Sequence, residues 1–187
     1  MSGIPVRRAA SYEDLLAVPD NLVAEIIDGE LITSPRPATR HIAAASALGD
    51  ELGPPFRRGR GGPGGWVILD EPELHIVGQV MVPDLTGWRR GRMPEIPDAA
   101  FFDLAPDWVC EVLSPSTAAL DRTRKWHHYA QAGVRHLWFL DPVPRTLEVY
   151  QLDSGSWRLV AAVAGDVLVR AQPFDAVEID LAAVWAR

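Results

Sequence analysis

The sequence predicts an α/β protein with a mixed central sheet and a β-hairpin near each end of the chain. Its 187 residues are enough for one hydrophobic core, and neither a linker nor an internal repeat divides them, so we expect one domain over residues 1–187. A helical pattern at 117–132 separates two apolar strands, 108–113 and 136–141. This order favours a parallel crossover within the sheet.

The N-terminal elements are predicted from caps and turns. Ser11 opens the stretch S-Y-E-D-L-L as an N-cap with acidic residues in the first turn, which indicates a short helix. Asp28-Gly29 separates two apolar stretches and predicts a hairpin, and Glu25 lies close to that turn. From 39 to 52 apolar and small residues recur at helical spacing, and Gly53-Pro54-Pro55 is expected to end this helix.

Three strands are predicted in the middle of the chain, at residues 66–77, 79–88 and 107–114. Gly78 is expected to form the turn between the first two. Beyond the crossover, two alternating patterns around Asp153-Ser154-Gly155 predict the C-terminal hairpin. The final stretch F-D-A-V-E-I-D-L-A-A-V-W is predicted to be a strand that runs into a short helix.

Composition is that of an ordinary globular protein, with 48% apolar and 23% charged residues. The formal net charge of −7 argues against tight non-specific binding of nucleic acid through a basic surface. It does not exclude a nucleic-acid enzyme, since bound divalent cations cancel acidity locally. The N-terminus lacks the apolar core of a secretory signal, no apolar run approaches the ~20 residues that span a bilayer, and the single cysteine fits a reducing compartment. We therefore expect a cytoplasmic protein without a membrane partner.

Two carboxylates of the predicted sheet point to a metal site. Asp84 follows Pro83 at the end of the second central strand, and Glu111 lies inside the apolar run of the third. Neighbouring strands would bring these groups together, and carboxylates ~4 Å apart repel strongly unless a cation lies between them. Hard oxygen ligands select Mg²⁺ or Mn²⁺. Taken alone, Asp84 is equally well explained as a turn residue at a strand end.

Lys125 is unusual because it is the single lysine among 18 cationic side chains. It lies on the helix predicted after Glu111, with Asp121 one turn earlier as an i, i+4 partner. Near carboxylates and a metal, a lysine can orient or deprotonate an attacking water and offset charge on a phosphorus centre. The simpler alternative is a salt bridge between Lys125 and Glu111 without catalysis. Cys110 alternates away from Glu111 and is expected to be a core thiol.

These residues belong to a longer pattern: E-I-I-D-G-E-L, P-R-P with a following histidine, V-P-D-L, and then C-E-V-L-S-P-S-T with D-x-x-x-K, Y and G-V-x-x-L-W-F-L-D-P. From about Tyr12 to Trp185 the chain resembles the Uma-two-type restriction endonuclease family, part of the PD-(D/E)xK nuclease-like group. The S-P-S-T…D…K…Y…G-V part is specific, whereas a P-D pair alone is weak.

The resemblance implies a restriction-endonuclease-like αβββαβ core in which Asp84 and Glu111 hold the metal. It also implies that Glu25, from the N-terminal hairpin, adds an acidic group to the site. The E-x-K motif of such nucleases would place a lysine at residue 113, where this chain has Leu113. Lys125 on the following helix is the substitute that the resemblance suggests.

The leading hypothesis is a Mg²⁺-dependent (or Mn²⁺-dependent) endonuclease that hydrolyses DNA with a metal-activated water. Asp84 and Glu111 would bind the ion, and Lys125 would orient the water or neutralise charge. The alternative is a catalytically inactive nuclease-fold module that binds or regulates, favoured by the acidic net charge and the missing local E-x-K. Hydrolysis of another phosphate-containing substrate is a third hypothesis. The roles of His41, which matches a family position, and of Asp121 stay open.

A homodimer is compatible with this function, because cutting both strands of a duplex with one type of active site requires two such sites. The C-terminal hairpin and the apolar tail at 174–185 are the places to look for its interface. The sequence leaves the oligomeric state and the recognised DNA open.

Overall fold

The computed structural model describes residues 8–185. Residues 1–7 lie outside that range. The prediction that the N-terminus is not a secretory signal concerns these residues. The elements follow in the order α1 (Tyr12–Leu16), β1 (Leu22–Ile27), β2 (Glu30–Pro35), α2 (Thr39–Leu52), η1 (Gly53–Arg57), β3 (Trp66–Asp70), β4 (Leu74–Ile76), β5 (Gln79–Met81), β6 (Leu85–Arg89), β7 (Trp108–Val112), α3 (Ala118–Leu120), η2 (Asp121–Lys125), α4 (Trp126–Gln131), β8 (His136–Asp141), β9 (Thr146–Asp153), β10 (Ser156–Ala164), β11 (Leu168–Val169), β12 (Ile179–Asp180) and α5 (Leu181–Val184).

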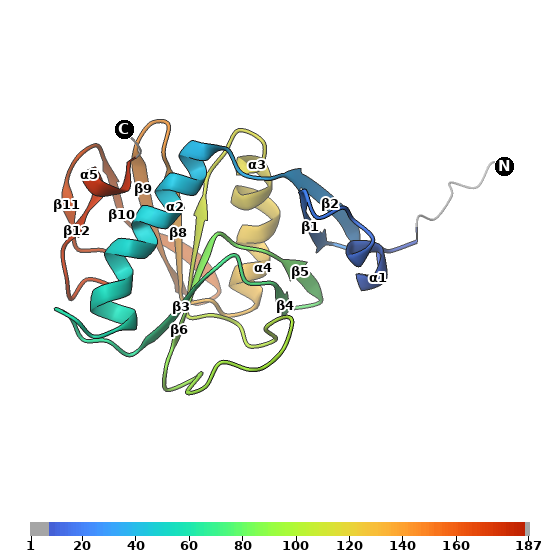
Figure 1. Cartoon of the computed structure of the whole chain (residues 1–187), viewed down its shortest axis with the longest axis horizontal. Helices are drawn as coiled ribbons and strands as arrows, with labels where there is room; N and C mark the ends of the chain where they lie inside the picture. Colours follow the sequence, from blue (N-terminus) through green and yellow to red (C-terminus); the bar gives the residue numbers. More distant parts are fainter. Residues whose placement is uncertain (1–7, 186–187) are drawn as a thin grey trace.

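Two sheets form the frame of the molecule. The larger sheet has six strands in the order β10-β9-β8-β7-β6-β3, and the smaller has four in the order β2-β1-β5-β4. Figure 1 shows the strands of the smaller sheet beside the larger one, on the side from which the N-terminus projects. The predicted α/β class with a mixed central sheet is confirmed.

The predicted αβββαβ core is present as α2, β3, β6, β7, the helix built from α3, η2 and α4, and β8. β6 is antiparallel to both β3 and β7, whereas β7 and β8 are parallel and place Glu111 opposite Phe139. The parallel crossover predicted from the helix between two apolar strands is therefore correct.

Both predicted hairpins form. In the N-terminal one, Asp28 and Gly29 have φ values of 55° and 75°, as a two-residue turn of the mirror-image type requires. The C-terminal one pairs β9 with β10 through a turn at Ser154 and Gly155. The Ser11 cap is also confirmed, because its side chain accepts the N–H of Asp14 in a capping box.

Two predicted strands are wrong in extent, since each divides into two that belong to different sheets. Residues 79–88 form β5 in the small sheet and β6 in the large one, with Val82, Pro83 and Asp84 between them. Pro83 has no N–H to give to a ladder, so a continuous strand is broken there. Residues 66–77 divide in the same way into β3 and β4. Asp84 therefore lies in the short segment that connects the two sheets, and not at the end of a long strand.

The helices also differ from the prediction at two points. Gly53-Pro54-Pro55 does not end the second helix, because the chain continues as the π-helical turn η1 before it leaves the helical path. The helix at 117–132 is interrupted by a second π-helical segment, η2, between α3 and α4. Periodicity of apolar residues does not distinguish such segments from a continuous α-helix.

The central strands of the large sheet, β6, β7 and β8, are buried on both faces. On one face, Leu48 and Leu52 of α2 and Leu181 of α5 pack against a layer that includes Trp108 and Trp138. The other face meets α4 and the small sheet through a second apolar cluster. Cys110 lies on the first face at 0% exposure, which confirms it as a core thiol. Glu111, the next residue, faces the other side, where the candidate site lies.

The C-terminal tail is predicted to be a place for a dimer interface, but its apolar side chains are used inside the chain itself. Phe174, Leu181 and Val184 are fully buried, and the Phe174 ring lies 4.8 Å from the ring of Trp66 and 4.9 Å from that of Trp108, centroid to centroid. Its apolar character thus needs no second chain. Within residues 8–185 no helix has the length and apolarity that a membrane crossing requires.

Candidate functional site

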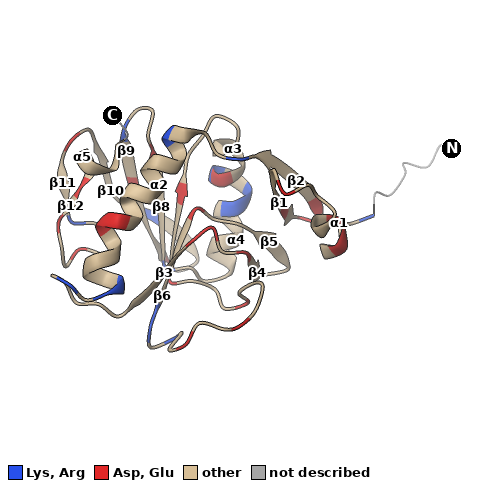
Figure 2. Cartoon of the chain, in the orientation of Figure 1, with Lys and Arg blue, Asp and Glu red and all other residues tan. Residues whose placement is uncertain are grey.

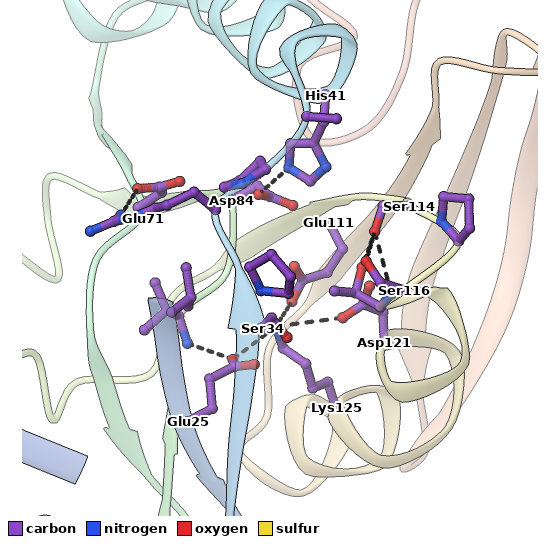
Figure 3. A pocket seen from close by; sticks show the side chains of 18 residues that line it. Glu25, Ser34, His41, Glu71, Asp84, Glu111, Ser114, Ser116, Asp121 and Lys125 are labelled. Atoms are coloured by element: carbon purple, nitrogen blue, oxygen red, sulfur yellow. Dashed lines mark hydrogen bonds and ion pairs between the residues drawn. The ribbon is translucent and has the colours of Figure 1, made fainter. Parts of the chain in front are cut away.

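A pocket of about 340 Å³ opens where the N-terminal hairpin and the start of α2 meet the end of β7 and the helix that follows it. Figure 3 shows His41 and Asp84 on one side of this pocket and Glu25, Lys125 and Asp121 on the other, with Glu111 between them. The predicted site residues Glu25, Asp84, Glu111 and Lys125 all line it. Residues that lie up to 100 positions apart in the chain are brought together here by the packing of the small sheet against the large one.

Asp84 is held at both carboxylate oxygens. Because β6 pairs with β7 immediately after it, the Asp84 side chain lies at the end of β7, where Oδ2 accepts the backbone N–H of Val112 at 2.7 Å. The other oxygen, Oδ1, lies 2.6 Å from Nε2 of His41. Asp84 and Glu111 line the same pocket, as the neighbouring strands predict.

Glu111 lies at the centre of the site and is only 2% exposed, although it belongs to a central strand. Its Oε1 accepts the hydroxyl of Tyr129 at 2.5 Å and lies 2.9 Å from Nζ of Lys125. Burial raises the pKa of Glu111 well above its usual range; the charge of Lys125 opposes this, and the carboxylates of Asp121 and Asp84 add to it. Both donors hold the same oxygen of Glu111.

Lys125 is enclosed by carboxylates. Its Nζ lies 2.9 Å from Glu111 Oε1, 3.0 Å from Glu25 Oε1 and 3.6 Å from Asp121 Oδ1, and the residue is 3% exposed. Burial alone would lower the pKa of Lys125, but the charges of Glu111 and Glu25 outweigh it and hold the pKa well above its usual range. These carboxylates favour the protonated form of Lys125, in which its ammonium group donates hydrogen bonds.

The π-helical segment η2 carries the inward-facing pair Asp121 and Lys125, each 3% exposed. Their i, i+4 contact agrees with the sequence prediction. Burial raises the pKa of Asp121, with Lys125 acting against it. The arginines of the same segment face outward, where Arg122 pairs with Glu148 and Arg124 binds the N-terminal hairpin. π-helical segments are frequent at functional sites.

Glu25 reaches the site from β1. Its Oε1 accepts the backbone N–H of Val82 at 2.8 Å and lies 3.0 Å from Lys125 Nζ. The residue is 6% exposed. Glu25 therefore contacts the lysine directly, and it ties the N-terminal hairpin to the segment that leads into Asp84.

Two side chains that the sequence leaves without a role hold the carboxylates in place. His41, in the first turn of α2, contacts Asp84 through Nε2, while its Nδ1 is buried and has no hydrogen-bond partner within residues 8–185. Tyr129, fully buried on α4, donates its hydroxyl to Glu111. Tyr129 could have been identified from its position four residues after Lys125, because that spacing places both side chains on one side of a helix.

The donor set of the pocket fits Mg²⁺ or Mn²⁺. Five carboxylates line the pocket, those of Glu25, Glu71, Asp84, Glu111 and Asp121, against the two cations Arg36 and Lys125, so negative charge is in excess. Within the described residues, no three His, Cys, Asp or Glu side chains are grouped as a closed metal cage. Mg²⁺ does not require one, because it keeps several waters and binds through one or two carboxylates together with substrate phosphates.

Comparisons with known proteins identify the family and the fold. The family model Uma2, described as "Putative restriction endonuclease", matches residues 9–182. Among solved structures, a "putative nuclease belonging to DUF820" from Anabaena variabilis superposes with a TM-score of 0.75 at 22% sequence identity, over 94% of this chain and 97% of that one. At that level of sequence identity, the similarity shows that the two proteins share a fold. A search of curated proteins gave no match.

Proposed function

The chain belongs to the Uma2 family, whose model carries the description "Putative restriction endonuclease", and from this premise we propose that it is a Mg²⁺-dependent endonuclease acting on DNA. The observation that carries the proposal is the convergence of Asp84, Glu111 and Lys125 in one pocket. The reaction is hydrolysis of a phosphodiester bond by water.

In this proposal Asp84 and Glu111 would hold the ion, which when bound would supply an activated water and offset negative charge on the phosphate. The chain's own groups prepare those two ligands. Val112 N–H and His41 hold Asp84, and Tyr129 and Lys125 hold Glu111 through Oε1. Ligands fixed in this way need little rearrangement during the reaction.

Lys125 acts in the proposal as a hydrogen-bond donor and a positive charge. The carboxylates around Lys125 raise its pKa, so of the two roles expected from the sequence, orienting the water is favoured over deprotonating it. Glu25 and Asp121 hold the lysine in place, at 3.0 Å and 3.6 Å from Nζ. Glu25 is thus a positioning residue for Lys125.

A cleavage assay tests the reaction. Supercoiled, linear, branched and single-stranded DNA are incubated with Mn²⁺ or Mg²⁺, using the wild type, Lys125→Ala and the control Asp50→Asn, whose carboxylate is exposed on α2. We expect cleavage by the wild type and the control, and a loss of about 100-fold or more in Lys125→Ala. A binding module without catalysis would instead leave all three proteins at the background rate.

Calorimetric titration with Mn²⁺ tests the metal separately from the substrate. The wild type is expected to bind Mn²⁺, and Glu111→Ala to bind it much more weakly, because one of two protein ligands is gone. If the wild type binds neither Mn²⁺ nor Mg²⁺, or if Glu111→Ala binds as the wild type does, the proposed role of the pocket is wrong.

A further inference from the structure

Arg36 lies at the mouth of the pocket, in the connection between β2 and α2. It lines the pocket together with Ser34, Pro35 and Pro37. Figure 2 shows this connection coloured as basic where the chain passes from the hairpin to the helix. The proposed reaction assigns Arg36 no role, although the sequence pattern P-R-P singles it out.

Among the residues that line the pocket, Arg36 is the cation whose charge is not neutralised by a close carboxylate, so it can bind a ligand. Lys125, the other lining cation that is always charged, is 3% exposed and has three carboxylates within 4 Å. The Arg36 side chain is 57% exposed, and its Nη1 lies 3.9 Å from Glu71 Oε2, a loose contact between two exposed groups. The nearby arginines of η2 are already bound to carboxylates.

The position of Arg36 is fixed by its neighbours. Pro35 and Pro37 restrict the backbone on both sides, and Nη2 of Arg36 donates to the carbonyl oxygen of Asp20 at 2.9 Å. The guanidinium is therefore held at the rim while much of it faces solvent. A planar guanidinium is well suited to phosphate, because its N–H groups can bind two oxygens at once.

The charge of the pocket explains why a guanidinium at its mouth would be useful. Its interior is rich in carboxylates, which repel an approaching phosphodiester even when a divalent ion is bound. A fixed positive charge at the mouth offsets that repulsion where the substrate enters. We propose that Arg36 anchors the DNA by binding a backbone phosphate at the mouth of the pocket. This inference rests on the proposed function, which supplies DNA as the substrate class.

Binding of a fluorescently labelled duplex, followed by anisotropy in buffer with EDTA and over 50–200 mM salt, tests the inference without cleavage. Arg36→Gln is compared with Arg40→Gln, because Arg40 is also an exposed arginine, one turn further along, but does not line the pocket. We expect Arg36→Gln to weaken binding about tenfold at 100 mM salt and to reduce the slope of log K against log[salt] by about 0.9, the value of one phosphate contact. Arg40→Gln should keep the wild-type slope.

A purely structural role for Arg36, through its bond to Asp20, is separated by two further measurements. Arg36→Lys keeps a charge, so it should restore the salt slope while leaving part of the affinity lost. The free energy of unfolding of Arg36→Gln should stay within about 1 kcal/mol of the wild type. With Mn²⁺ present, Arg36→Gln should raise KM for DNA more than it lowers kcat.

The inference is overturned if Arg36→Gln has the wild-type affinity and salt slope, or if Arg40→Gln loses as much as Arg36→Gln does. It is also overturned if the wild type binds no duplex. These outcomes are independent of catalysis: DNA bound through Arg36 without any cleavage would contradict the nuclease proposal alone, and cleavage with an unchanged Arg36→Gln would contradict the anchoring role alone.

Discussion

Lys125 Nζ lies 2.9 Å from Glu111 Oε1, so Glu111 on β7 is contacted by a lysine from the following helix. Residue 113, directly after β7, is leucine. Leu113 is 3% exposed and belongs to the apolar cluster between the sheet and α4. A lysine at 113 would have to place its charge within that cluster or displace it. Lys125 reaches Glu111 from the helix without that cost.

Replacing Lys125 by methionine is predicted to destabilise the protein by about 3–5 kcal/mol at pH 7, because buried carboxylates lose their cation. The loss should depend on pH. Burial raises the folded pKa of Glu111, and the charge of Lys125, which opposes this rise, is absent from the variant. An acid with a raised folded pKa loses stability as pH rises above its unfolded value, so the variant should fall further behind the wild type between pH 5 and pH 8.

Urea unfolding at several pH values measures this difference. Arg158→Met is the matched control, because the contacts of Arg158 are exposed: it donates to Gln151 Oε1 at 2.9 Å and lies 3.9 Å from Asp153. Exposed ion pairs contribute less than about 1 kcal/mol. A Lys125→Met protein as stable as the control would show that the buried cluster is not held by the lysine.

Removing the hydroxyl of Tyr129 is predicted to weaken the site without opening a large cavity. Tyr129→Phe deletes the 2.5 Å hydrogen bond to Glu111 and should cost about 1.5–3 kcal/mol, the range for bonds to charged groups. Glu111 then keeps Lys125 as its one donor, so we also expect weaker binding of Mn²⁺.

Calorimetry with Mn²⁺ and urea unfolding together check the Tyr129→Phe variant. Tyr150→Phe is the control, because Tyr150 donates to Glu148 on the outer strands, away from the pocket. It should leave Mn²⁺ binding unchanged. Equal effects of the two variants on Mn²⁺ binding would argue against a role of Tyr129 in holding the ligand.

Much of this site follows from the sequence because the signals are local. Glu111 in an apolar run and a lysine one helix later are visible in the order of residues. The helix between two apolar strands predicts the parallel crossover, whereas the αβββαβ core is what the family resemblance implies. The position of Asp84 beside Glu111 needed one further fact, that β6 pairs with β7, and neighbouring strands usually do pair.

The parts that the sequence does not predict depend on contacts between distant segments. The split at Pro83 gives one half of a predicted strand to the small sheet, because β5 pairs with β1 as well as β4. The tail at 174–185 is apolar in sequence whether it meets its own core or a second chain, and only the packing of Phe174 decides between these. His41 reaches Asp84 from 43 residues away, a contact that no local pattern encodes.

His136 is predicted to make stability depend on pH. Burial lowers the pKa of His136 from 6.5 to about 4, and the charges of Arg89 and Arg135 add to this. Between these values the unfolded chain binds a proton that the folded protein does not, so stability should fall as pH drops from 6.5 towards 4. The slope from one group is at most about 1.4 kcal/mol per pH unit, and partial exposure of the ring reduces it.

The comparison of the wild type with His136→Gln isolates this effect from the carboxylates that titrate in the same range. Urea unfolding between pH 4.5 and 7 should show a smaller loss of stability in the variant. His127→Gln is the control, since His127 lies on the exposed side of α4, where its ring contacts Gln131. The same pH dependence in all three proteins would assign the loss to other groups.

Gly87 is predicted to be intolerant of any side chain. It lies on β6, and a Cβ there would come within 3.2 Å of Trp108 Cε3 and of Trp66 Cε3, two fully buried indoles on the neighbouring strands. Neither ring can move without displacing the core, so Gly87→Ala should cost about 1–3 kcal/mol. Because β6 begins next to Asp84, displacing it should also weaken Mn²⁺ binding.

Gly91→Ala is the matched control for Gly87→Ala, because a Cβ at that position meets nothing within 4 Å and the loop backbone accepts it. Its stability should equal that of the wild type or exceed it slightly, since alanine restricts the unfolded chain. Urea unfolding and Mn²⁺ calorimetry on both variants measure the two effects. If Gly87→Ala loses stability but binds Mn²⁺ as the wild type does, strand β6 does not set the position of Asp84.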